Sequence, residues 1–407
     1  MADVTVHRYK HEVPERLSDF DPSAFIDGAT REIAGLVGPE ERVALSASGG
    51  VDSTAVAFLL KEALGDRLHL FFIDDGLRRI IDGKEEWEAT AKIFEGFPNF
   101  EVLRTRSLVL PWFEGVADGT LKRDMFRGLY VIASNRHIAS LGADWIADGT
   151  IAPDIVMTDE KRQIQHNVNL PYNMRKLEPL APLYKPHVRK VMMHMGVPRD
   201  FAMRIPCPGP AQLLRVGGPF REEKLELSKR ATDIVESNFR RFDYDESTGV
   251  RTPFQYFATC LDPEMEADAA LGKVATEALG GRAEAFRMAD QAMWIDASVA
   301  TQERRLYAPI AWVRGPEAEP EARARLCDAV YKSAKLPRVL YEVHATGKPG
   351  YRSAIKVVES EDVRTAWPMP IAFAELARIG KAICENAGAS AVAYDISRRP
   401  PATIELF

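Results

Sequence analysis

The residues best suited to chemistry lie in one short loop, Ser48–Ser53, with the sequence SGGVDS. An apolar strand is predicted directly before this loop and an apolar helix directly after it. Backbone N–H groups at such a glycine-rich turn face outward from a helix N-terminus and bind polyanions. Gly49 and Gly50 let the backbone approach a phosphate closely, and the two serine hydroxyls add donors. The loop therefore predicts a phosphate-binding site.

Asp52 within this loop needs a different explanation, because a carboxylate beside phosphates is repulsive unless a divalent cation lies between them. We therefore predict that Asp52 is a Mg²⁺ ligand. The loop also lacks the Lys-Ser/Thr ending of a Walker loop, which indicates another class of phosphate site. An ordinary strand–turn–helix connection is the alternative that needs no ligand.

The elements that must position this loop alternate between strand and helix through the first half of the chain. Short apolar runs alternate with segments of helical periodicity, and the predicted strands cover 43–46, 68–73, 100–105 and 143–147. This alternation predicts an α/β fold with a doubly wound parallel sheet, whose ligands bind beyond the carboxyl ends of the strands. Two polar motifs at strand ends, Asp74–Arg79 and Asp148–Asp154, should therefore share one cleft with the loop.

The alternation stops near residue 220. Before that point, the polar stretch Met157–Asn173 fits a mobile lid over the cleft. After it, Glu222–Phe242 is predicted to be a charged helix, and Asp262–Arg325, rich in Ala, Glu and Arg, is also predicted to be helical. The last elements predict a small α+β domain: strands over 338–344 and 351–358, a helix over 371–386 and a strand over 391–396.

Composition narrows the class of protein. The chain has 407 residues, enough for two or three domains, and a net charge of -6, which argues against a general nucleic-acid-binding surface. Its four cysteines lie far apart without a CxxC pair, so neither a disulfide framework nor a structural zinc site is expected. The charged N-terminus and the lack of a long apolar run predict neither a signal peptide nor a membrane helix. We expect a cytoplasmic enzyme.

The motifs, taken in order, resemble one family along most of the chain. They are SGGVDS, FIDDGLRR, DGTIAPD, HNV, LEPLAPLYKPHVR, RIPCPGP, QYFA and YDISRRPPATIE. This series resembles the synthetase part of GMP synthetase, an ATP pyrophosphatase with a PP-loop of the adenine nucleotide α-hydrolase type. The resemblance covers roughly residues 22–262 and 350–405.

The same resemblance implies a domain organisation. It implies an N-terminal extension over 1–21, an ATP-pyrophosphatase domain over 22–220 and an α+β dimerisation and acceptor-binding domain over 221–407. A helical insertion is expected at about 263–349, within the last of these. The resemblance further implies a homodimer.

The chemistry that the resemblance implies uses ATP and Mg²⁺. The C2 carbonyl oxygen of xanthosine 5′-phosphate (XMP) would attack the α-phosphate of ATP, releasing pyrophosphate, and ammonia would then displace AMP to give GMP. Adenylation replaces a poor leaving group with a good one. Because no glutaminase domain precedes the synthetase part, we expect ammonia from solution or from a separate glutaminase subunit.

Carried over position by position, the resemblance implies three groups of site residues. The catalytic residues would be Asp52, Lys185 and Arg123, with Asp52 also holding the metal. ATP would be bound by Ser48, Gly49, Gly50, Val51, Asp52, Ser53, Asp74, Arg79, Gly149 and Thr150. The acceptor would be bound by His166, Asn167, Arg204, Arg215, Gln255, Arg399, Thr403 and Glu405.

Three departures from the family pattern lie in or beside this site. The KSHHN lid becomes QIQHN at 163–167, the QGT turn becomes DGT at 148–150, and the chain ends in Glu405-Leu406-Phe407 without the family's final acidic residue. These changes leave two alternatives open. One is a ligase that adenylates a different acceptor, and the other is a catalytically silent nucleotide-binding subunit.

Cys207 adds a further alternative, an adenylating sulfurtransferase. The residue lies in the RIPCPGP loop, and other ATP pyrophosphatases use a cysteine to deliver sulfur. A thiol near Arg204 would be reactive if its pKa were lowered. A small buried apolar role is the competing interpretation, and the long match at the acceptor end favours amination.

Overall fold

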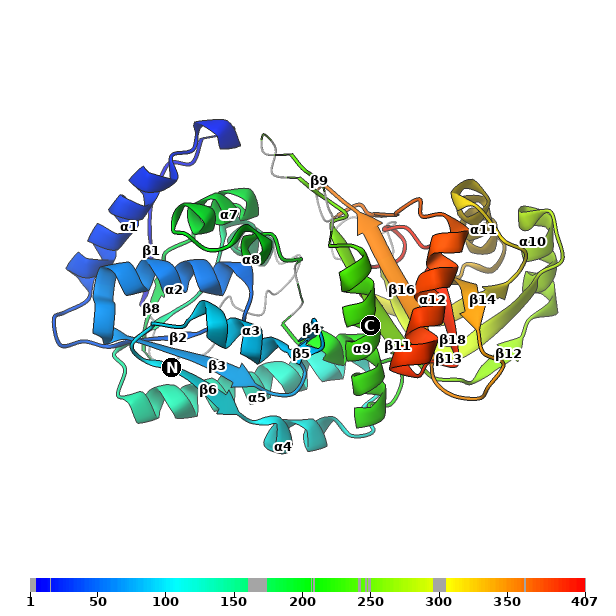
Figure 1. Ribbon diagram of the computed structural model, residues 1–407, viewed down its shortest axis with the longest axis horizontal. Coiled ribbons are helices and arrows are strands. Elements are labelled where there is room, and N and C mark those ends of the chain that lie inside the picture. Colours follow the sequence, from blue (N-terminus) through cyan, green and yellow to red (C-terminus); the bar gives the residue numbers. More distant parts are fainter. Residues whose placement is uncertain are drawn as a thin grey trace.

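The computed structural model describes residues 5–14, 16–159, 174–205, 207, 209–240, 243–245, 247, 250–295, 305–361 and 364–406. Figure 1 shows a parallel sheet with its helices in the first half of the chain and a second sheet with its own helices in the last part. Helix α9 (Glu222–Asn238) lies between the two sheets.

The first sheet has six strands, all parallel, in the order β1-β8-β7-β2-β3-β6. Strands β2 and β7 are neighbours although the chain visits β3 and β6 between them, so the order reverses at this point. Ligands of such sheets bind where the order reverses, beyond the strand ends. The strands are β1 (Val6–Arg8), β2 (Val43–Ser46), β3 (Leu68–Asp74), β6 (Phe100–Arg104), β7 (Trp145–Ala147) and β8 (Arg175–Glu178).

Strand β1 belongs to the segment expected to be an N-terminal extension. It pairs with β8 as the edge strand of the sheet, and Arg8 Nε lies 2.6 Å from Glu178 Oε2. The beginning of the chain is therefore part of the nucleotide-domain sheet rather than an appendage. Its three residues are too short a run to be recognised from periodicity.

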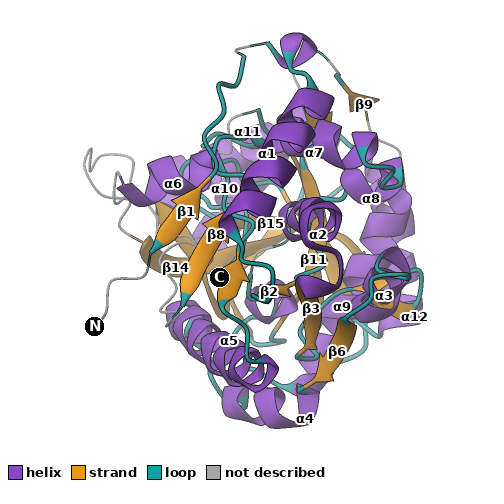
Figure 2. Ribbon diagram, turned by 90° about the vertical axis from the view of Figure 1, so that its left-hand side faces the viewer, coloured by secondary structure: helices purple, strands orange, loops and turns teal. Residues whose placement is uncertain are grey.

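Helices cover both faces of the first sheet (Figure 2), which confirms the doubly wound α/β prediction. Leu59 and Val188 pack on one face with Leu45 of β2, whereas Val131 and Ile138 of α5 pack with the other face. On the first face lie α1 (Pro22–Leu36), α2 (Val51–Leu64), α3 (Glu86–Ile93) and α7 (Lys185–His194), and on the second lies α5 (Gly119–Leu141). Shorter elements of this half are β4 (Ile80–Ile81), β5 (Lys84–Glu85), α4 (Arg106–Val109), α6 (Ala152–Asp159) and α8 (Arg199–Ala202).

The second sheet is mixed and has eight strands, in the order β11-β16-β18-β15-β14-β13-β12, with β17 paired to β16. Its strands are β11 (Gln255–Leu261), β12 (Met265–Ala267), β13 (Glu284–Ile295), β14 (Arg305–Arg314), β15 (Val339–Ala345), β16 (Arg352–Glu359), β17 (Trp367–Pro368) and β18 (Ala391–Asp395). Its helices besides α9 are α10 (Ala269–Leu279), α11 (Pro320–Ala334) and α12 (Phe373–Ala387). A small hairpin, β9 (Asp243–Tyr244) and β10 (Arg251–Thr252), follows α9.

The prediction that 263–349 is helical is wrong. Besides α10 and α11, this segment supplies β12 to β15, of which β13 is the longest strand among the described residues. The buried residues of β13 include Ala285, Met288 and Ala292, and the exposed residues between them include Arg287 and Gln291. A bulge shifts the register between Arg287 and Gln291, so the two-residue period of a strand is interrupted and the Ala-rich composition suggested a helix instead.

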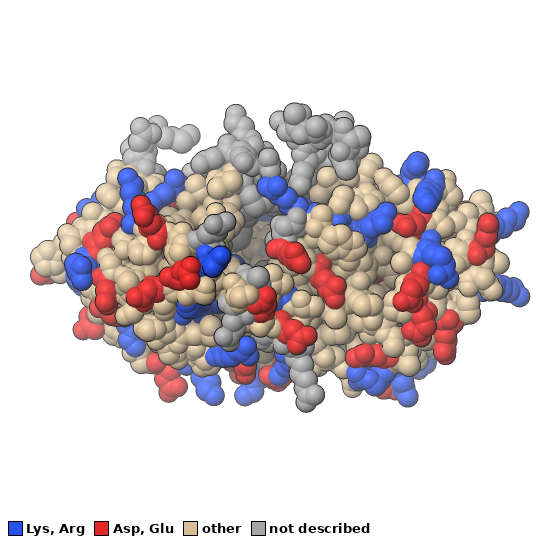
Figure 3. All heavy atoms as spheres, turned by 90° about the horizontal axis from the view of Figure 1, so that it is seen from above, with Lys and Arg blue, Asp and Glu red and all other residues tan. Residues whose placement is uncertain are grey.

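Figure 3 shows one face of the molecule with its charged side chains. Lys and Arg are interspersed with Asp and Glu over this face instead of gathering into one basic patch. Within the described ranges, every helix is too short or too polar to cross a lipid bilayer.

Candidate functional site

The glycine loop connects β2 to α2 at the reversal point of the parallel sheet. Gly49 has a φ of +75°, and a Cβ there would lie 2.9 Å from Thr90 Oγ1, so glycine is required. The Ser48 and Ser53 hydroxyl oxygens lie 3.0 Å apart. Helix α2 begins directly after Gly50, which has no side chain to cap it, and its first-turn N–H groups are directed toward the space beyond the strand end. This geometry fits a bound phosphate.

The turn after β7 packs directly on this loop. A Cβ on Gly149 would lie 3.1 Å from both Asp52 Cβ and the backbone nitrogen of Ser53. The two predicted ATP motifs therefore meet, as neighbouring strand ends should. Thr150 is fully buried, and its hydroxyl donates to Glu178 Oε1 at 3.1 Å, so it fixes the turn instead of facing a ligand.

Asp148, the acidic residue at the start of this turn, is balanced by Lys176 on the adjacent strand β8. Lys176 Nζ lies 2.9 Å from Asp148 Oδ2 and 2.7 Å from Glu178 Oε1. Burial raises the pKa of Asp148 to about 6, although Lys176 opposes this shift. Asp148 stands where the family pattern has a glutamine, and the buried Lys176 offsets the negative charge that this change adds.

Asp52 lies in the first turn of α2 and accepts a hydrogen bond on Oδ2 from Lys185 Nζ, at the start of α7. Its other oxygen, Oδ1, is buried without a hydrogen-bond partner in the described part of the chain. A buried carboxylate oxygen beside a phosphate loop fits a hard cation such as Mg²⁺. No cluster of three metal-ligating side chains occurs among the described residues, so phosphate and water oxygens would complete the coordination.

A buried arginine cluster lies behind the loop. Arg79 Nη2 donates to Glu86 Oε1 at 2.8 Å, and Arg79 Nη1 donates to Glu236 Oε1 of α9 at 3.0 Å. Arg204 Nη1 lies 3.5 Å from the carbonyl oxygen of Gly49, and burial lowers the pKa of Arg204 to about 10. The predicted residues Arg79 and Arg204 therefore lie beside the loop. The hydrogen bond from Arg79 to Glu236 links helix α9 to the same cluster.

Two other predicted residues contact partners outside the phosphate loop. Asp74 Oδ2 pairs with Arg104 at 3.3 Å. Arg123 Nη1 donates to a backbone carbonyl one turn earlier in its own helix at 3.2 Å. The predicted lid beyond residue 159 lies outside the described residues. So do two predicted acceptor ligands, His166 and Asn167.

Cys207 lies between the two ends of the candidate site. Burial raises the pKa of its thiol, whereas Arg215 and Arg79 oppose that shift and Glu86 and Glu405 add to it. The lowered pKa that would make this thiol reactive is therefore not found, because burial outweighs the nearby arginines. Arg79 of the arginine cluster and two residues of the acceptor end, Arg215 and Glu405, are therefore close enough to Cys207 to act on its thiol.

The acceptor end is built around Arg215, whose side chain is fully buried. Its guanidinium carbon lies 4.1 Å from the centre of the Phe257 ring, and Nε lies 3.5 Å from Glu405 Oε2. All three guanidinium nitrogens lack a hydrogen-bond partner among the residues that the structure describes. Gln255 Nε2 donates to Glu405 Oε1 at 3.1 Å. A buried cation without hydrogen bonds is costly unless an anion binds it, so this end suits a phosphate.

Thr403 and Arg399, the remaining predicted acceptor residues, lie in the C-terminal tail 399–406. The Thr403 hydroxyl donates to the Met293 carbonyl at 3.0 Å and accepts from Arg338 Nη2 at 2.9 Å, so it has a structural role in the tail. The backbone of Arg399 exchanges hydrogen bonds with Ala366 at 2.8 and 3.1 Å.

Sequence reasoning missed three residues that shape this site. Lys176 lies directly before the Leu177-Glu178-Pro179 motif, and this position is the signal that the sequence offers, because its strand, Arg175–Glu178, contains a single apolar residue. Glu86 and Arg338 give no such signal, because only the fold brings them to their partners.

The geometry fits one class of protein, a ligase of the ATP-pyrophosphatase type: a glycine loop lies at the reversal point of a parallel sheet, and a buried arginine lies at the other end of the candidate site. The profile of the family described as "GMP synthase C terminal domain" matches residues 337–406.

Relatives agree with this class over longer stretches. The chain is 35% identical to a subunit of the glutamine-hydrolyzing GMP synthase of Methanothermobacter thermautotrophicus, over 60% of this chain and 76% of the relative. It is 29% identical to the corresponding subunit of Sulfurisphaera tokodaii, over 95% of this chain and 99% of the relative. Among solved structures, an NH3-dependent NAD synthetase from Campylobacter jejuni aligns with 45% of this chain and 77% of its own, at 16% identity and a TM-score of 0.36, too low to carry an argument. The chain belongs to the same family of GMP synthase subunits, which confirms the resemblance found in the sequence.

Proposed function

We propose that this chain adenylates the C2 carbonyl oxygen of XMP with ATP and then replaces AMP by ammonia to give GMP. One observation carries the proposal. Arg79, which lies beside the phosphate loop, and Arg215, whose buried guanidinium has no hydrogen-bond partner among the described residues, both interact electrostatically with the Cys207 thiol, so the two ends lie near one another. An ATP end and an anion-binding acceptor end within reach of one another are what transfer of AMP to a nucleotide requires.

At the ATP end, the α2 N-terminus and the Ser48 and Ser53 hydroxyls would bind the β- and γ-phosphates that leave as pyrophosphate. Lys185 would neutralise part of the charge that builds on the leaving group. Asp52 would hold Mg²⁺ through Oδ1. When bound, the cation would offset phosphate charge and favour cleavage between the α- and β-phosphates.

At the acceptor end, Arg215 would bind the 5′-phosphate of XMP, with Arg399 as a second cation. Glu405 and Gln255 hold each other at 3.1 Å and would contact the purine. The carbonyl oxygen of XMP attacks the α-phosphate and pyrophosphate leaves. Ammonia then attacks C2, and AMP leaves with the former carbonyl oxygen. We assign catalytic roles to Asp52 and Lys185, and Arg123 stays a predicted third.

We propose further that a separate glutaminase subunit supplies the ammonia, because relatives in this family are named as one subunit of a glutamine-hydrolysing enzyme. The division near residue 220 into an ATP-pyrophosphatase domain, to which strand β1 belongs, and an acceptor-binding domain over 221–407 is part of the same proposal. A homodimer and a cytoplasmic location stay predictions, which light scattering and cell fractionation would test.

Product analysis tests the proposal. Purified protein is incubated with ATP, Mg²⁺, ammonium and either XMP or xanthosine, and products are identified by mass. We expect AMP, pyrophosphate and GMP with XMP, and little AMP with xanthosine. ADP and orthophosphate as the stoichiometric products would contradict the proposal.

A further inference from the structure

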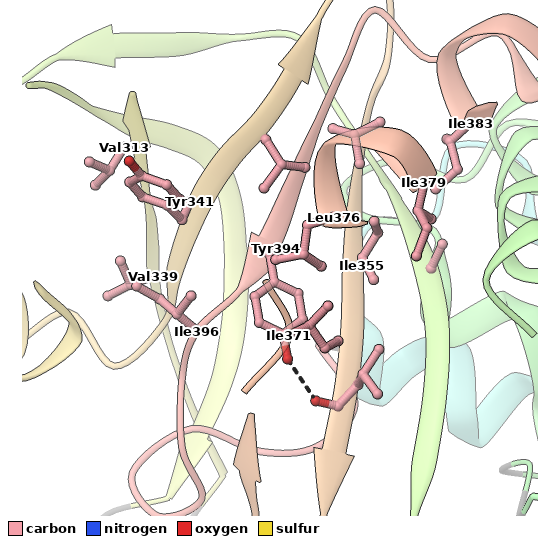
Figure 4. Close-up of a cluster of buried hydrophobic side chains, with 14 of the residues drawn as sticks. Val313, Val339, Tyr341, Ile355, Ile371, Leu376, Ile379, Ile383, Tyr394 and Ile396 are labelled. Carbon is pink, nitrogen blue, oxygen red and sulfur yellow. Dashed lines mark hydrogen bonds between the residues drawn. The ribbon is translucent and has the colours of Figure 1, made fainter. Parts of the chain in front are cut away.

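The centre of the second sheet is a pair of antiparallel strands, β15 and β18, in which Tyr341 lies directly opposite Tyr394. Figure 4 shows both tyrosines in the same buried cluster, together with Val339 and Ile396. Strand β14 runs parallel to β15 on one side, and β16 runs parallel to β18 on the other. The sheet therefore has the same arrangement on both sides of its centre.

The sequence repeats along with the strands. Helices α11 and α12 each have 15 residues, and each ends at a residue in the left-handed conformation, Lys335 or Gly388. Tyr341 and Tyr394 follow their helices at the same spacing. Buried apolar residues also match at equal spacing, as the pairs Leu326 and Ile379, Val330 and Ile383, Val339 and Val392, and Val343 and Ile396.

Hydrogen bonds of the two tyrosines also match. The Tyr341 hydroxyl donates to the carbonyl of Pro316, and the Tyr394 hydroxyl donates to the carbonyl of Met369 at 2.8 Å. Pro316 and Met369 lie the same number of residues before α11 and α12.

Ion pairs beside the tyrosines repeat as well. Glu342, which follows the first tyrosine, pairs with Arg314 Nε at 2.9 Å. Asp395, which follows the second, pairs with Lys356 Nζ at 3.2 Å. In the two parallel ladders, Arg314 and Lys356 hold equivalent positions, one residue beyond the partner of each tyrosine.

We infer that α10-β13-β14-α11-β15 is a second copy of the unit α9-β11-β16-α12-β18, and that it serves as a built-in partner that positions the acceptor-binding tail through Arg338. The copy is inserted into the hairpin of the first unit, where β11 and β16 pair from Leu261 and Arg352 onward. The two units contact each other as the halves of a two-fold dimer do, through the same element on each side. The functional part of this inference rests on the proposed function.

The units differ at one informative position. Arg338 of the second unit corresponds to Ala391 of the first, and the arginine is fully buried. Its Nη1 donates to Asp395 at 2.7 Å, while Nη2 donates to the Thr403 hydroxyl at 2.9 Å and to the Glu405 carbonyl at 3.1 Å. The guanidinium of Arg338, in the second unit, therefore holds Thr403 and Glu405 of the tail that follows the first unit.

Strand β13 of the second unit holds the rest of the tail. Met293 N–H donates to the Leu406 carbonyl at 2.8 Å, and Ile295 N–H donates to the Pro401 carbonyl at 2.8 Å. Glu405, which lies between these contacts and reaches Arg215, is therefore positioned by a unit that supplies no predicted acceptor ligand. Arg338 is a positioning residue for the acceptor site.

Two matched substitutions test this inference in the full-length chain. Arg338→Met removes the tail contacts, and Arg314→Met removes the Arg314–Glu342 ion pair, which includes no residue of the tail. For Arg338→Met we expect a rise of at least tenfold in the KM for XMP, with the KM for ATP within about twofold of wild type, because only the acceptor tail loses contacts. For Arg314→Met we expect both KM values to stay near wild type.

Hydrogen–deuterium exchange of the tail provides a readout that does not need activity. Arg338→Met should accelerate exchange over 399–406 and Arg314→Met should not. Thr403→Val, which keeps the shape but removes the hydroxyl that accepts from Arg338, replaces Arg338→Met if that variant does not fold. Equal effects of both arginine variants, or no effect of either on the tail, would overturn the inference. If the wild-type chain makes no GMP but the two variants still differ in exchange over 399–406, the proposed function is overturned and the inference about the tail is not.

Discussion

The ATP end and the acceptor end of the candidate site are built in opposite ways. Residues of the ATP end come mainly from one continuous motif on a helix N-terminus, and its charged pair is partly open to solvent, with side-chain exposures of 26% for Asp52 and 33% for Lys185. The acceptor end is assembled from segments that are distant in the sequence. Its centre is Arg215, whose side chain is fully buried, with Glu405, whose side chain is 15% exposed.

This difference teaches what each end requires. The triphosphate of ATP is highly charged. It can be bound by backbone N–H groups of one helix N-terminus and by a nearby lysine, all of which come from local structure. Recognition of one purine nucleotide requires buried polar groups whose positions are held from several sides, and here the second structural unit does part of that work. Losses at the ATP end should therefore lower kcat, and losses at the acceptor end should raise the KM for XMP.

Asp52→Asn gives the largest expected effect. Removing the charge that holds Mg²⁺ and pairs with Lys185 should lower the rate of pyrophosphate release by about 10²- to 10³-fold, as for loss of one transition-state contact. Glu62→Gln, at an exposed position on the same helix, is the matched control and should be near wild type. A similar rate for both variants would remove Asp52 from the catalytic residues.

Arg215→Met should act on the other end. Loss of a charge-assisted hydrogen bond to phosphate costs about 1.5–3 kcal/mol, which is roughly a 10- to 150-fold rise in the KM for XMP. The KM for ATP should change little. Steady-state kinetics with each substrate varied, together with a melting curve to show that the variant folds, check this expectation. A larger effect on ATP than on XMP would reverse the assignment of the two ends.

Asp148→Asn should change how stability depends on pH. An unfolded Asp releases its proton near pH 3.8, whereas burial raises the pKa of Asp148 in the folded protein to about 6. Between these values the folded protein binds more protons at this site, so its contribution to the free energy of unfolding falls as pH rises. The difference in Tm between variant and wild type should therefore change from pH 4 to pH 6 and stay constant above pH 7. A difference that is flat across this range would show that Lys176 fully offsets the burial.

Cys207→Ser gives the smallest expected effect. A thiol with a raised pKa has no role in amination, so ammonia-dependent GMP formation should stay within about threefold of wild type. Release of pyrophosphate without any nucleotide product from this variant would instead support sulfur transfer.

The comparison also explains what could be predicted from the sequence. The loop, the strand ends and the α/β order follow local patterns, so Asp52, Ser48 and Gly149 were found and meet in the structure. Local patterns do not predict contacts between residues that only the fold brings together. Examples are the ion pair between Lys176 and Asp148 and the hydrogen bond from Arg338 to Thr403. The sequence pattern predicts a helical insertion in place of the second unit, because the β13 bulge breaks the strand period and the match to the C-terminal unit lies mostly in apolar positions, which many sequences share.

The central claim is that AMP leaves with the acceptor's own carbonyl oxygen. XMP labelled with ¹⁸O at the C2 carbonyl, incubated with the protein, ATP, Mg²⁺ and ammonium, tests it by mass spectrometry of the products. Our account predicts that the label appears in AMP, in an amount equal to the GMP formed, and that pyrophosphate carries none. Unlabelled AMP, or label released into water or orthophosphate, would contradict adenylation of the purine.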